Sequence, residues 1–469
     1  MKRIDVDVAI IGAGSAGMSA YKAARTHTDR LVVIEDGPYG TTCARVGCMP
    51  SKLLIAAAAS AHTIDNSARF GIEVDGRRVD GTAVMERVRR ERDRFVGFVL
   101  DTVDRWPEGH KLQGRARFLA PGVLCVNDEI HVNAARIIIA TGAQPSVPDG
   151  WHDRLGERLI VNDDVFNWTT LPDSVAVVGT GVVGLELAQA LHRLGVRVRL
   201  FGRSSKAGPL TDPVTQAAVK AWLQTTLPYS ANAADITPHR EGEAVVVQWR
   251  DEHQAQRSER FDYLLAAAGR RPALAGLDLD KAGIPLDEKG VPPFDPETCR
   301  IGDTAVFIAG DADNDRPLLH EAADDGRIAG HNAGRYPDVR RETRRTPLNI
   351  VFTDPQMAIA GASHAELNRS GASFAWGEAS FADQGRARMM GRNQGLMRVY
   401  GARENGRLLG AELFGPDVEH LAHLLAWSIQ RGDSANIALA SPFYHPVVEE
   451  GLRTALQGLA RALRDGPQA

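Results

Sequence analysis

The chain has 469 residues, of which 43% are hydrophobic and 24% are charged. At about 150 residues per domain this length predicts roughly three domains, and the ordinary composition excludes a peptide ligand, a disulfide-stabilised miniprotein and a disordered chain. Lys and Arg number 55 against 59 Asp and Glu, a formal net charge of -4 without a long basic block, so nucleic acid is not an expected partner.

The start of the chain and its apolar runs argue against export and membrane insertion. Residues 1–14 (MKRIDVDVAIIGAG) are interrupted by Asp5 and Asp7 and lead into a glycine turn, which indicates a strand and not a signal sequence. Apolar runs such as residues 53–59 are far shorter than the ~20 residues that a membrane helix needs. We therefore expect a cytoplasmic protein that does not contact a membrane.

Two segments share one pattern of strand, glycine turn, helix and strand. In the first, residues 6–11 lead into GAGSAG, a helical stretch at 18–25 and the strand-like LVVIE that ends at Glu35. In the second, residues 175–178 lead into GTGVVG, the helical LELAQALHRL and VRVRLF. Each pattern is the smallest unit of a parallel nucleotide-binding sheet. The sequence thus predicts two dinucleotide-binding domains of the α/β class.

The other segments complete this outline. Residues 84–103 predict a long exposed helix, and ARIIIATGA (135–143) predicts a buried strand that is followed by QPSVPDG, a natural domain boundary. A third segment after residue 272 ends in the strand-like TAVFIAGD. From about residue 346, strand-like runs (LNIVFT, GLMRVYG and RLLGAELFG) alternate with two helical ones, which predicts an α+β domain.

The first glycine motif, Gly12, Gly14 and Gly17, favours binding of an adenine dinucleotide. Glycine at these positions permits a sharp turn, close approach of the backbone to a pyrophosphate and tight packing of helix on strand, and the helix N-terminus attracts the anion. Glu35 ends the second strand, where its carboxylate can accept hydrogen bonds from ribose hydroxyls. The alternative is a glycine turn with only a structural role.

The second motif, Gly179, Gly181 and Gly184, lacks the equivalent acid. The position 23 residues after Gly179 is Gly202, and Arg203 follows it. An arginine here can pair with a 2′-phosphate, which favours NADP over NAD. The alternative is that Arg203 faces solvent and a neighbouring group binds NAD.

Cys43 and Cys48 form the close pair among the four cysteines of the chain. Gly47 could let the backbone bend so that the two thiols close a small disulfide ring, and a helix that begins near Pro50 would stabilise a thiolate on Cys48. Zinc would need two further ligands, whereas Cys125 and Cys299 are single and remote, so no metal site is expected. Redox chemistry is the favoured interpretation, with a structural role as the alternative.

The run TTCARVGCMPSK resembles the GGTCxNxGCxPSK signature of the flavin-dependent pyridine nucleotide-disulfide oxidoreductases. The resemblance covers almost the whole chain, since further motifs occur in the family's order: IIIATGA (137–143), AAAGRRP (266–272), VFIAGDA (306–312), VFTDPQMA (351–358) and FYHPVVEE (443–450). It implies an α/β fold with two Rossmann-like domains and a C-terminal α+β dimerisation domain. The implied parts are an FAD-binding domain (1–147), an NAD(P)-binding domain (148–272), a segment that completes the FAD domain (273–345) and the dimerisation domain (346–469).

The resemblance also implies roles for individual residues. Cys48 would lie against the flavin and Cys43 would exchange with the substrate. Lys52 would lie beside flavin N5, paired with Glu186, unless the two form an unrelated salt bridge. FAD would be held by the first glycine motif with Glu35, and by Asp311 at the ribityl chain. The resemblance further implies that Thr42, Thr141, Gly142 and Gly269 contribute to cofactor binding.

His445 and Glu450 lie in the sequence HPVVEE. A histidine titrates near neutrality and can pass protons to and from a thiol, while a carboxylate can fix its tautomer. By itself His445 would be interpreted as one of 14 unremarkable histidines. In the family this pair is the acid-base dyad, and it acts on the cysteines of the other subunit, so the resemblance implies a homodimer.

The chain departs from the family signature beside the thiols. Thr41 replaces the second glycine and Arg45 replaces the usual asparagine. We expect both changes to affect access of the substrate to the thiols. Mercuric reductase is disfavoured because no cysteine follows Cys299, so the paired C-terminal thiols are absent from the sequence.

The expected function is transfer of two electrons between NAD(P)H and a small disulfide or dithiol through Cys43 and Cys48, most like dihydrolipoamide dehydrogenase. The expected cofactors are FAD and NADP, or NAD in its place, and a multienzyme acyl-transfer complex is a possible partner. One alternative is an NADPH-dependent reductase of another disulfide or of a quinone. An alternative of another class is a flavin-bearing binding or assembly subunit with vestigial thiols.

Overall fold

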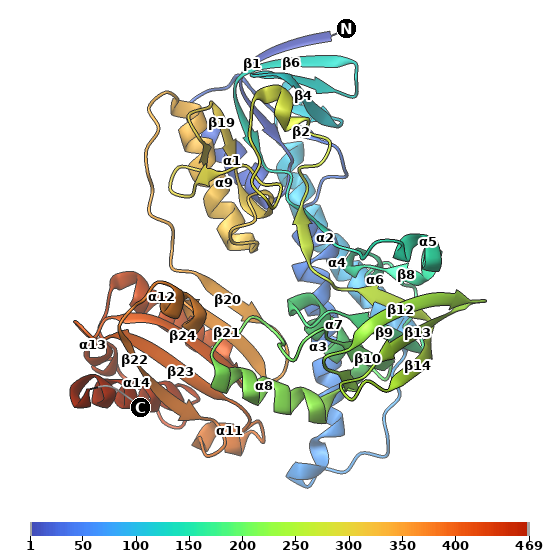
Figure 1. Ribbon diagram of the computed structural model, residues 1–469, viewed down its shortest axis with the longest axis vertical. Helices are drawn as coiled ribbons and strands as arrows, with labels where there is room; N and C mark the ends of the chain where they lie inside the picture. The colour runs from blue at the N-terminus through green and yellow to red at the C-terminus, as the bar shows by residue number, and fades with distance from the viewer. Residues whose placement is uncertain (1, 467–469) are drawn as a thin grey trace. The chain divides into compact units, whose positions relative to one another are not determined.

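The computed structural model describes residues 2–466. The chain forms two compact units, each built from several segments (Figure 1). The first unit contains residues 1–50, 87–146 and 269–344, and the second contains residues 51–86, 147–268 and 345–469. Two helices continue from one unit into the other, α3 (Cys48–Asp65) and α4 (Gly81–Asp104).

The first unit is built on a mixed sheet with a parallel centre. Strand β1 (Lys2–Ile11) pairs in parallel with β2 (Leu31–Glu35) on one side and with β6 (Ile130–Ile139) on the other. The sheet continues through β3 (Lys111–Gln113) next to β2 and β19 (Val306–Ile308) next to β6, both parallel. Residues 8–10 and 137–139 are buried, as expected for strands covered on both faces.

Further strands extend this sheet or lie beside it. Antiparallel strands are added at β6 and at β19, and a separate two-stranded sheet follows the end of β6. The added strands are β4 (Ala116–Ala120), β5 (Val123–Val126), β17 (Phe294–Asp295) and β18 (Arg300–Ile301), and the separate pair is β7 (Ala143–Pro145) with β16 (Arg270–Pro272).

Helix α1 (Ser15–Ala24) packs closely against α9 (Leu319–Arg335), which lies beside it (Figure 1). Gly326, Gly330 and Gly334 form one row of α9, since residues four apart share a helix face. A Cβ at Gly326 would collide with the backbone of Ala16, and one at Gly330 would collide with that of Ala20. The helices therefore approach as closely as glycine allows, which fixes the position of α1.

The second unit contains a fully parallel sheet of five strands, of which β9 (Ser174–Val178) is central. On one side lie β10 (Arg197–Phe201) and β11 (Tyr229–Ser230), and on the other β15 (Tyr263–Ala266) and β8 (Leu159–Ile160). Helix α7 (Val182–Arg193) contacts β9 and β10, and the other helices of this region are α5 (Trp151–Leu155), α6 (Asn162–Val165) and α8 (Pro213–Thr226). A small antiparallel sheet consists of β12 (Ala234–Glu241), β13 (Ala244–Arg250) and β14 (Gln256–Phe261).

The second unit also contains an antiparallel sheet in the order β20-β21-β24-β23-β22. Its strands are β20 (Leu348–Val351), β21 (Gln356–Gly361), β22 (Phe374–Ser380), β23 (Leu396–Ala402) and β24 (Leu408–Gly415). Helix α12 (Val418–Arg431) packs on β21 and β24, and α14 (Glu449–Asp465) packs on β22 and β23. The remaining helices are α10 (His364–Arg369), α11 (Gly385–Met389) and α13 (Ala435–Leu439). A core of buried side chains from the strands, α12 and α14 holds this α+β region together.

The predicted fold class is confirmed. The structure contains two sheets with parallel, Rossmann-like centres, in which α1 follows β1 and α7 follows β9, and an α+β region in residues 348–465. The C-terminal region has more helices than the two that the sequence predicted, because α10, α11 and α13 are only five or six residues long. The proposed domain boundaries at 147/148, 272/273 and 345/346 remain predictions.

The close packing of α9 on α1 leads to a paired prediction. Gly326→Ala should lower the free energy of unfolding by about 1–3 kcal/mol, because the new methyl group meets immovable backbone. Gly97 lies inside α4, and a Cβ there has nothing within 4 Å. Gly97→Ala should therefore stabilise the protein by about 0.5–1 kcal/mol, since alanine favours helix. Denaturant unfolding of both variants checks this, and equal effects would contradict the described packing.

Candidate active site

Cys43 and Cys48 lie on consecutive helices at the end of the first unit's N-terminal segment. Cys43 is on α2 (Thr42–Val46) and is partly buried, while Cys48 is the first residue of α3 and is exposed. Between them, a Cβ on Gly47 would come within 3.2 Å of the Cys43 Cα. Gly47, with φ -123° and ψ -116°, is the single residue that joins α2 to α3, and Cys48 lies at the positive end of α3.

The replacement of glycine by Thr41 has a local explanation. Thr41 adopts φ 59° and ψ 148°, a positive-φ conformation that is rare for threonine. Its hydroxyl oxygen accepts a hydrogen bond of 3.2 Å from Ala44 N, which caps α2. The cap compensates for part of the conformational cost, since such a bond stabilises a helix start by about 1 kcal/mol.

A cavity of about 270 Å³ opens at the first glycine motif. Its lining brings together several predicted binding residues, namely Gly12, Gly14, Glu35, Thr42, Thr141 and Gly142. A Cβ on Gly12 or Gly17 would collide with backbone, whereas one on Gly14 has nothing within 4 Å. Gly12 and Gly17 therefore allow the tight turn and helix packing, and Gly14 leaves the start of α1 open to a ligand.

The polar groups of the cavity suit the ribose and diphosphate of an adenine dinucleotide. Glu35 accepts hydrogen bonds from Ala13 N (2.6 Å) and Gly37 N (2.9 Å), so its carboxylate is held at the cavity wall with lone pairs left for ribose hydroxyls. The Thr141 hydroxyl is buried without a hydrogen-bond partner, which is costly unless a ligand supplies one. The backbone N–H groups at the start of α1 suit a diphosphate.

Asp311 lies outside the residues that line this cavity, on the 3-10 turn Gly310–Ala312 that follows β19. Burial raises the pKa of its carboxyl group, and Arg270 partly offsets this rise. Two neighbouring carboxyl groups that the sequence analysis did not single out are buried more deeply. Burial raises the pKa of Asp313 and that of Asp325, although Arg344 lies 2.8 Å from Asp325.

The second glycine motif repeats the geometry of the first. A Cβ on Gly179 or Gly184 would collide with backbone, while one on Gly181 has nothing within 4 Å. Gly202 follows β10, and a Cβ there would come within 2.9 Å of the Thr180 side chain, so a glutamate at this position would require a rearrangement. Arg203 is exposed, and the exposed Lys206 follows on the same loop. The loop therefore presents two cations and no carboxylate.

Lys52 and Glu186 form the expected ion pair, with 2.7 Å between Lys52 Nζ and Glu186 Oε2. The Glu186 side chain is only 4% exposed, and its other oxygen accepts a hydrogen bond of 2.8 Å from Phe352 N. Lys52 Nζ also lies 4.7 Å from the centre of the Phe352 ring. The ammonium group is thus held by a buried carboxylate and an aromatic ring together.

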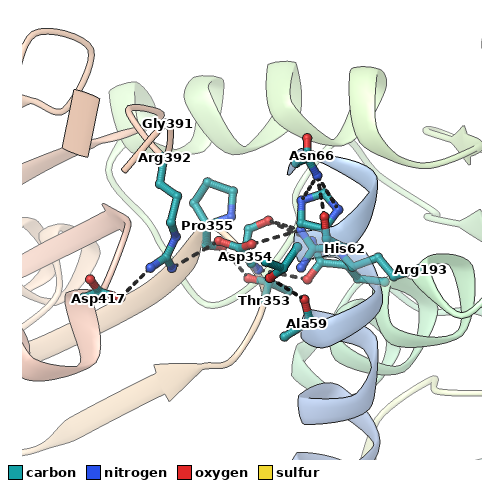
Figure 2. Close-up of polar contacts among 12 residues, drawn as sticks. Ala59, His62, Asn66, Arg193, Thr353, Asp354, Pro355, Gly391, Arg392 and Asp417 are labelled. Atoms are coloured by element: carbon teal, nitrogen blue, oxygen red, sulfur yellow. Dashed lines mark hydrogen bonds and ion pairs between the residues drawn. The ribbon is translucent and has the colours of Figure 1, made fainter. Parts of the chain in front are cut away.

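One face of α7 binds the segment between β20 and β21. Gln189 and Asp354 exchange two hydrogen bonds of 2.8 Å, one from Asp354 N and one to Asp354 O. The Asp354 carboxylate also pairs with Arg193 and with Arg392, which contacts Asp417 (Figure 2). The two arginines keep the pKa of Asp354 below its usual value, although burial opposes them as the largest single influence. Phe352 belongs to the same segment, so this network also fixes the backbone N–H group that Glu186 accepts a hydrogen bond from.

The sequence analysis missed Gln189, Arg193 and Asp354. A signal was present, because residues 186, 189 and 193 recur at the three- and four-residue spacing of one helix face. The motif VFTDPQMA that contains Asp354 was noted only as a mark of the family. Pairing of these two segments needs the tertiary fold, since they are about 165 positions apart.

His445, which precedes α14, is hydrogen-bonded to Glu450, which lies in the first turn of that helix. His445 Nδ1 lies 3.0 Å and 3.1 Å from the two carboxylate oxygens of Glu450. The contact with His445, together with a hydrogen bond from Val447 N, lowers the pKa of Glu450. Because Nδ1 faces the carboxylate and the imidazole side chain is 79% exposed, Nε2 is the nitrogen available for proton transfer.

Two broader features bear on the class of protein. Within residues 2–466, the structure contains no helix long and apolar enough to cross a membrane. In the same residues, no group of three or more His, Cys, Asp and Glu side chains is arranged to hold a metal ion.

Comparisons with known proteins agree with this geometry. Residues 6–326 match the model of the pyridine nucleotide-disulphide oxidoreductases, and residues 348–456 match that of their dimerisation domain. Dihydrolipoyl dehydrogenase 3 of Haloarcula marismortui is 28% identical over 96% of both chains, and dihydrolipoyl dehydrogenase of Thermus scotoductus is 29% identical over 97% of both. The flavoprotein disulfide reductase RclA from Escherichia coli shares the fold, with a TM-score of 0.79, 24% identity and coverage of 96% of this chain and 99% of its own.

Proposed function

The chain belongs to the pyridine nucleotide-disulphide oxidoreductases, and on that premise we propose that Cys43 and Cys48 are the thiols through which it exchanges electrons with its substrate. The family's reaction is FAD-dependent transfer of two electrons between NAD(P)H and a disulfide or dithiol. The supporting observation is that Gly47 alone separates the two helices that carry the cysteines, with Cys48 at the start of α3. We propose a small disulfide or dithiol of the lipoamide type as the substrate, since both curated relatives described above are dihydrolipoyl dehydrogenases.

FAD would be held at the cavity of the first glycine motif, and a nicotinamide dinucleotide at the second. The supporting observations are the open start of α1, the Glu35 carboxylate and the buried Thr141 hydroxyl. Bound FAD would transfer an electron pair between the nicotinamide and the cysteines. We assign Asp311 to the same cofactor and Gly269, which follows β15, to the nucleotide-binding residues, as the family pattern implies.

The cysteines carry the exchange with substrate. Two electrons and a proton convert the Cys43–Cys48 disulfide into a thiol and a thiolate. Cys48 is favoured as the thiolate because it begins α3. Cys43 then attacks the substrate disulfide, which releases one substrate thiol and forms a mixed disulfide. Attack by Cys48 on Cys43 releases the second thiol and restores the disulfide. Run in reverse, these steps oxidise a dithiol.

Lys52 and Glu186 would set the charge next to the redox centre. The Lys52 ammonium is held by Glu186 and Phe352, so it presents a fixed positive charge that favours electron-rich groups nearby. Glu186 needs this partner because its carboxylate is almost fully buried. The arrangement favours the interpretation that Glu186 positions the charge of Lys52. The alternative was an unrelated surface ion pair.

His445 would hold and return the proton that the thiols exchange. Its Nδ1 is oriented by Glu450, which fixes the tautomer with Nε2 free for proton transfer. The dimerisation-domain match supports a homodimer in which each His445 serves the cysteines of the partner subunit. Docking of this dimer on a larger acyl-transfer complex remains a proposal.

The assay that tests the proposed function combines substrates, cofactors and a cysteine variant. The protein should reduce or oxidise one of lipoamide, glutathione disulfide and a quinone with NADH or NADPH. Cys43→Ser should abolish turnover of disulfides while FAD remains bound, because the thiol that attacks the substrate is lost. Cys125→Ser is the matched control, since Cys125 is a buried side chain of β5. Full disulfide reductase activity of Cys43→Ser would refute the assignment and favour a subunit with vestigial thiols.

His445→Ala should slow disulfide turnover about 10² to 10⁴-fold, as is typical when a general acid-base is lost, without release of FAD. His423→Ala is a suitable control, because His423 is an exposed histidine of α12. Steady-state kinetics at several pH values check both variants. Unchanged turnover of His445→Ala would exclude the proposed role.

The cations after β10 support NADPH as the preferred nucleotide. Arg203→Glu should lower kcat/KM for NADPH by about 10- to 100-fold, because a charge-assisted contact of about 1.5–3 kcal/mol is replaced by repulsion of the 2′-phosphate. The value for NADH should change little, so it serves as the internal control. An unaltered ratio of the two values would show that Arg203 does not read the 2′-phosphate.

A further inference from the structure

The orientation of the Arg45 side chain is not evident from its position between the cysteines. The sequence predicted an effect on access to the thiols, but the side chain lines the cavity at the first glycine motif. Its NH1 group lies 3.4 Å from the carbonyl oxygen of Pro38, on the segment that follows Glu35. Arg45 therefore faces the candidate FAD site, although Cys43 lies two residues before it and Cys48 three residues after it.

The backbone around Arg45 makes room for this orientation. A Cβ on Gly40 would come within 3.0 Å of Arg45 Cδ and within 3.2 Å of Arg45 Cγ. A side chain at position 40 would thus displace the stem of the arginine. Gly40 is the glycine of the family signature that this chain retains, whereas Thr41 and Arg45 are its two departures.

The guanidinium group retains most of its hydrogen-bonding capacity. An arginine has five N–H donors, and the contact with Pro38 is longer than a typical hydrogen bond of 2.7–3.2 Å. Among the residues that the structure describes, no carboxylate lies within ion-pair distance of Arg45. Donors on a half-buried cation that faces a cavity are suited to an anionic ligand.

The charges of the cavity explain why a cation is useful there. Glu35 and Asp36 contribute two carboxylates to the lining, and Arg45 and Arg115 are its two cationic side chains. The Arg115 guanidinium packs next to Gly276, where a Cβ would lie 2.8 Å from its terminal nitrogen. A dinucleotide adds two negative charges to a cavity that already holds two, so the Arg45 charge offsets part of the repulsion.

We propose that Arg45 is a ligand of the diphosphate in the ADP half of FAD, and that it gives this chain a salt-dependent affinity for FAD that the asparagine of the family signature would not supply. The proposal rests on FAD as the cofactor of the proposed function. It assigns Arg45 to cofactor retention and not to access of substrate to Cys43 and Cys48.

The test is the affinity of the full chain for FAD, measured by flavin fluorescence after removal and return of the cofactor. Arg45→Asn should weaken binding at least about tenfold at low salt, and its Kd should depend less on salt than that of the unchanged protein. Arg45→Lys should retain the salt dependence because it keeps the charge. Arg90→Asn is the matched control, since Arg90 is an arginine of α4 whose side chain is 69% exposed.

A second measurement uses the holoprotein directly. The rate of FAD release on dilution should rise in Arg45→Asn, and free ADP should compete with FAD less well against this variant than against the unchanged protein. An FAD affinity and salt dependence equal to those of the unchanged protein would overturn the proposal. A raised KM for disulfide with unchanged FAD affinity would overturn it as well, because the arginine would then act at the thiols. Failure of the unchanged protein to bind FAD would instead refute the proposed function.

Discussion

The structure depends on two turns at which backbone must approach backbone more closely than any side chain permits. At Gly12 and Gly17, and again at Gly179 and Gly184, a single Cβ would collide with a carbonyl group of the turn or of a neighbouring strand. These contacts pack α1 and α7 closely against their sheets and leave the start of each helix open at Gly14 and Gly181. An open helix start attracts anions, so the same packing constraint that fixes the fold also shapes both of the proposed nucleotide sites.

The second recurrent feature is a carboxylate that is satisfied from two sides, buried at Glu186 and half-buried at Asp354. Glu186 bonds Lys52 with one oxygen and the backbone of Phe352 with the other. Asp354, two residues after Phe352, pairs with Arg193 and Arg392, and Figure 2 shows these ion pairs. Its backbone exchanges two hydrogen bonds with the Gln189 side chain. Removal of one partner from such a network leaves a buried charge uncompensated, which costs far more than a surface ion pair. The network therefore makes the position of Lys52 depend on a segment that is remote in the sequence.

Periodicity and glycine spacing predicted the parallel sheets well, because these signals are local. LVVIE was predicted as a strand that ends at Glu35, and β2 has these bounds. The His445–Glu450 contact was also predictable, since the two residues are five positions apart. Arg45 shows the limit of such reasoning, because its neighbours in sequence suggested the thiols whereas its side chain turns toward the cavity. Asp354 shows another limit, because its partners come from α7 and from the segment after α11.

The central claim is that Cys43 and Cys48 change redox state together. Alkylation of the protein with one reagent before anaerobic treatment with NADPH and with a second reagent after it, followed by mass spectrometry of the peptides, measures this directly. The account predicts that the second reagent labels Cys43 and Cys48 after reduction, while the labelling of buried Cys125 and Cys299 does not change. Labelling of both Cys43 and Cys48 by the first reagent in the air-oxidised protein would contradict it.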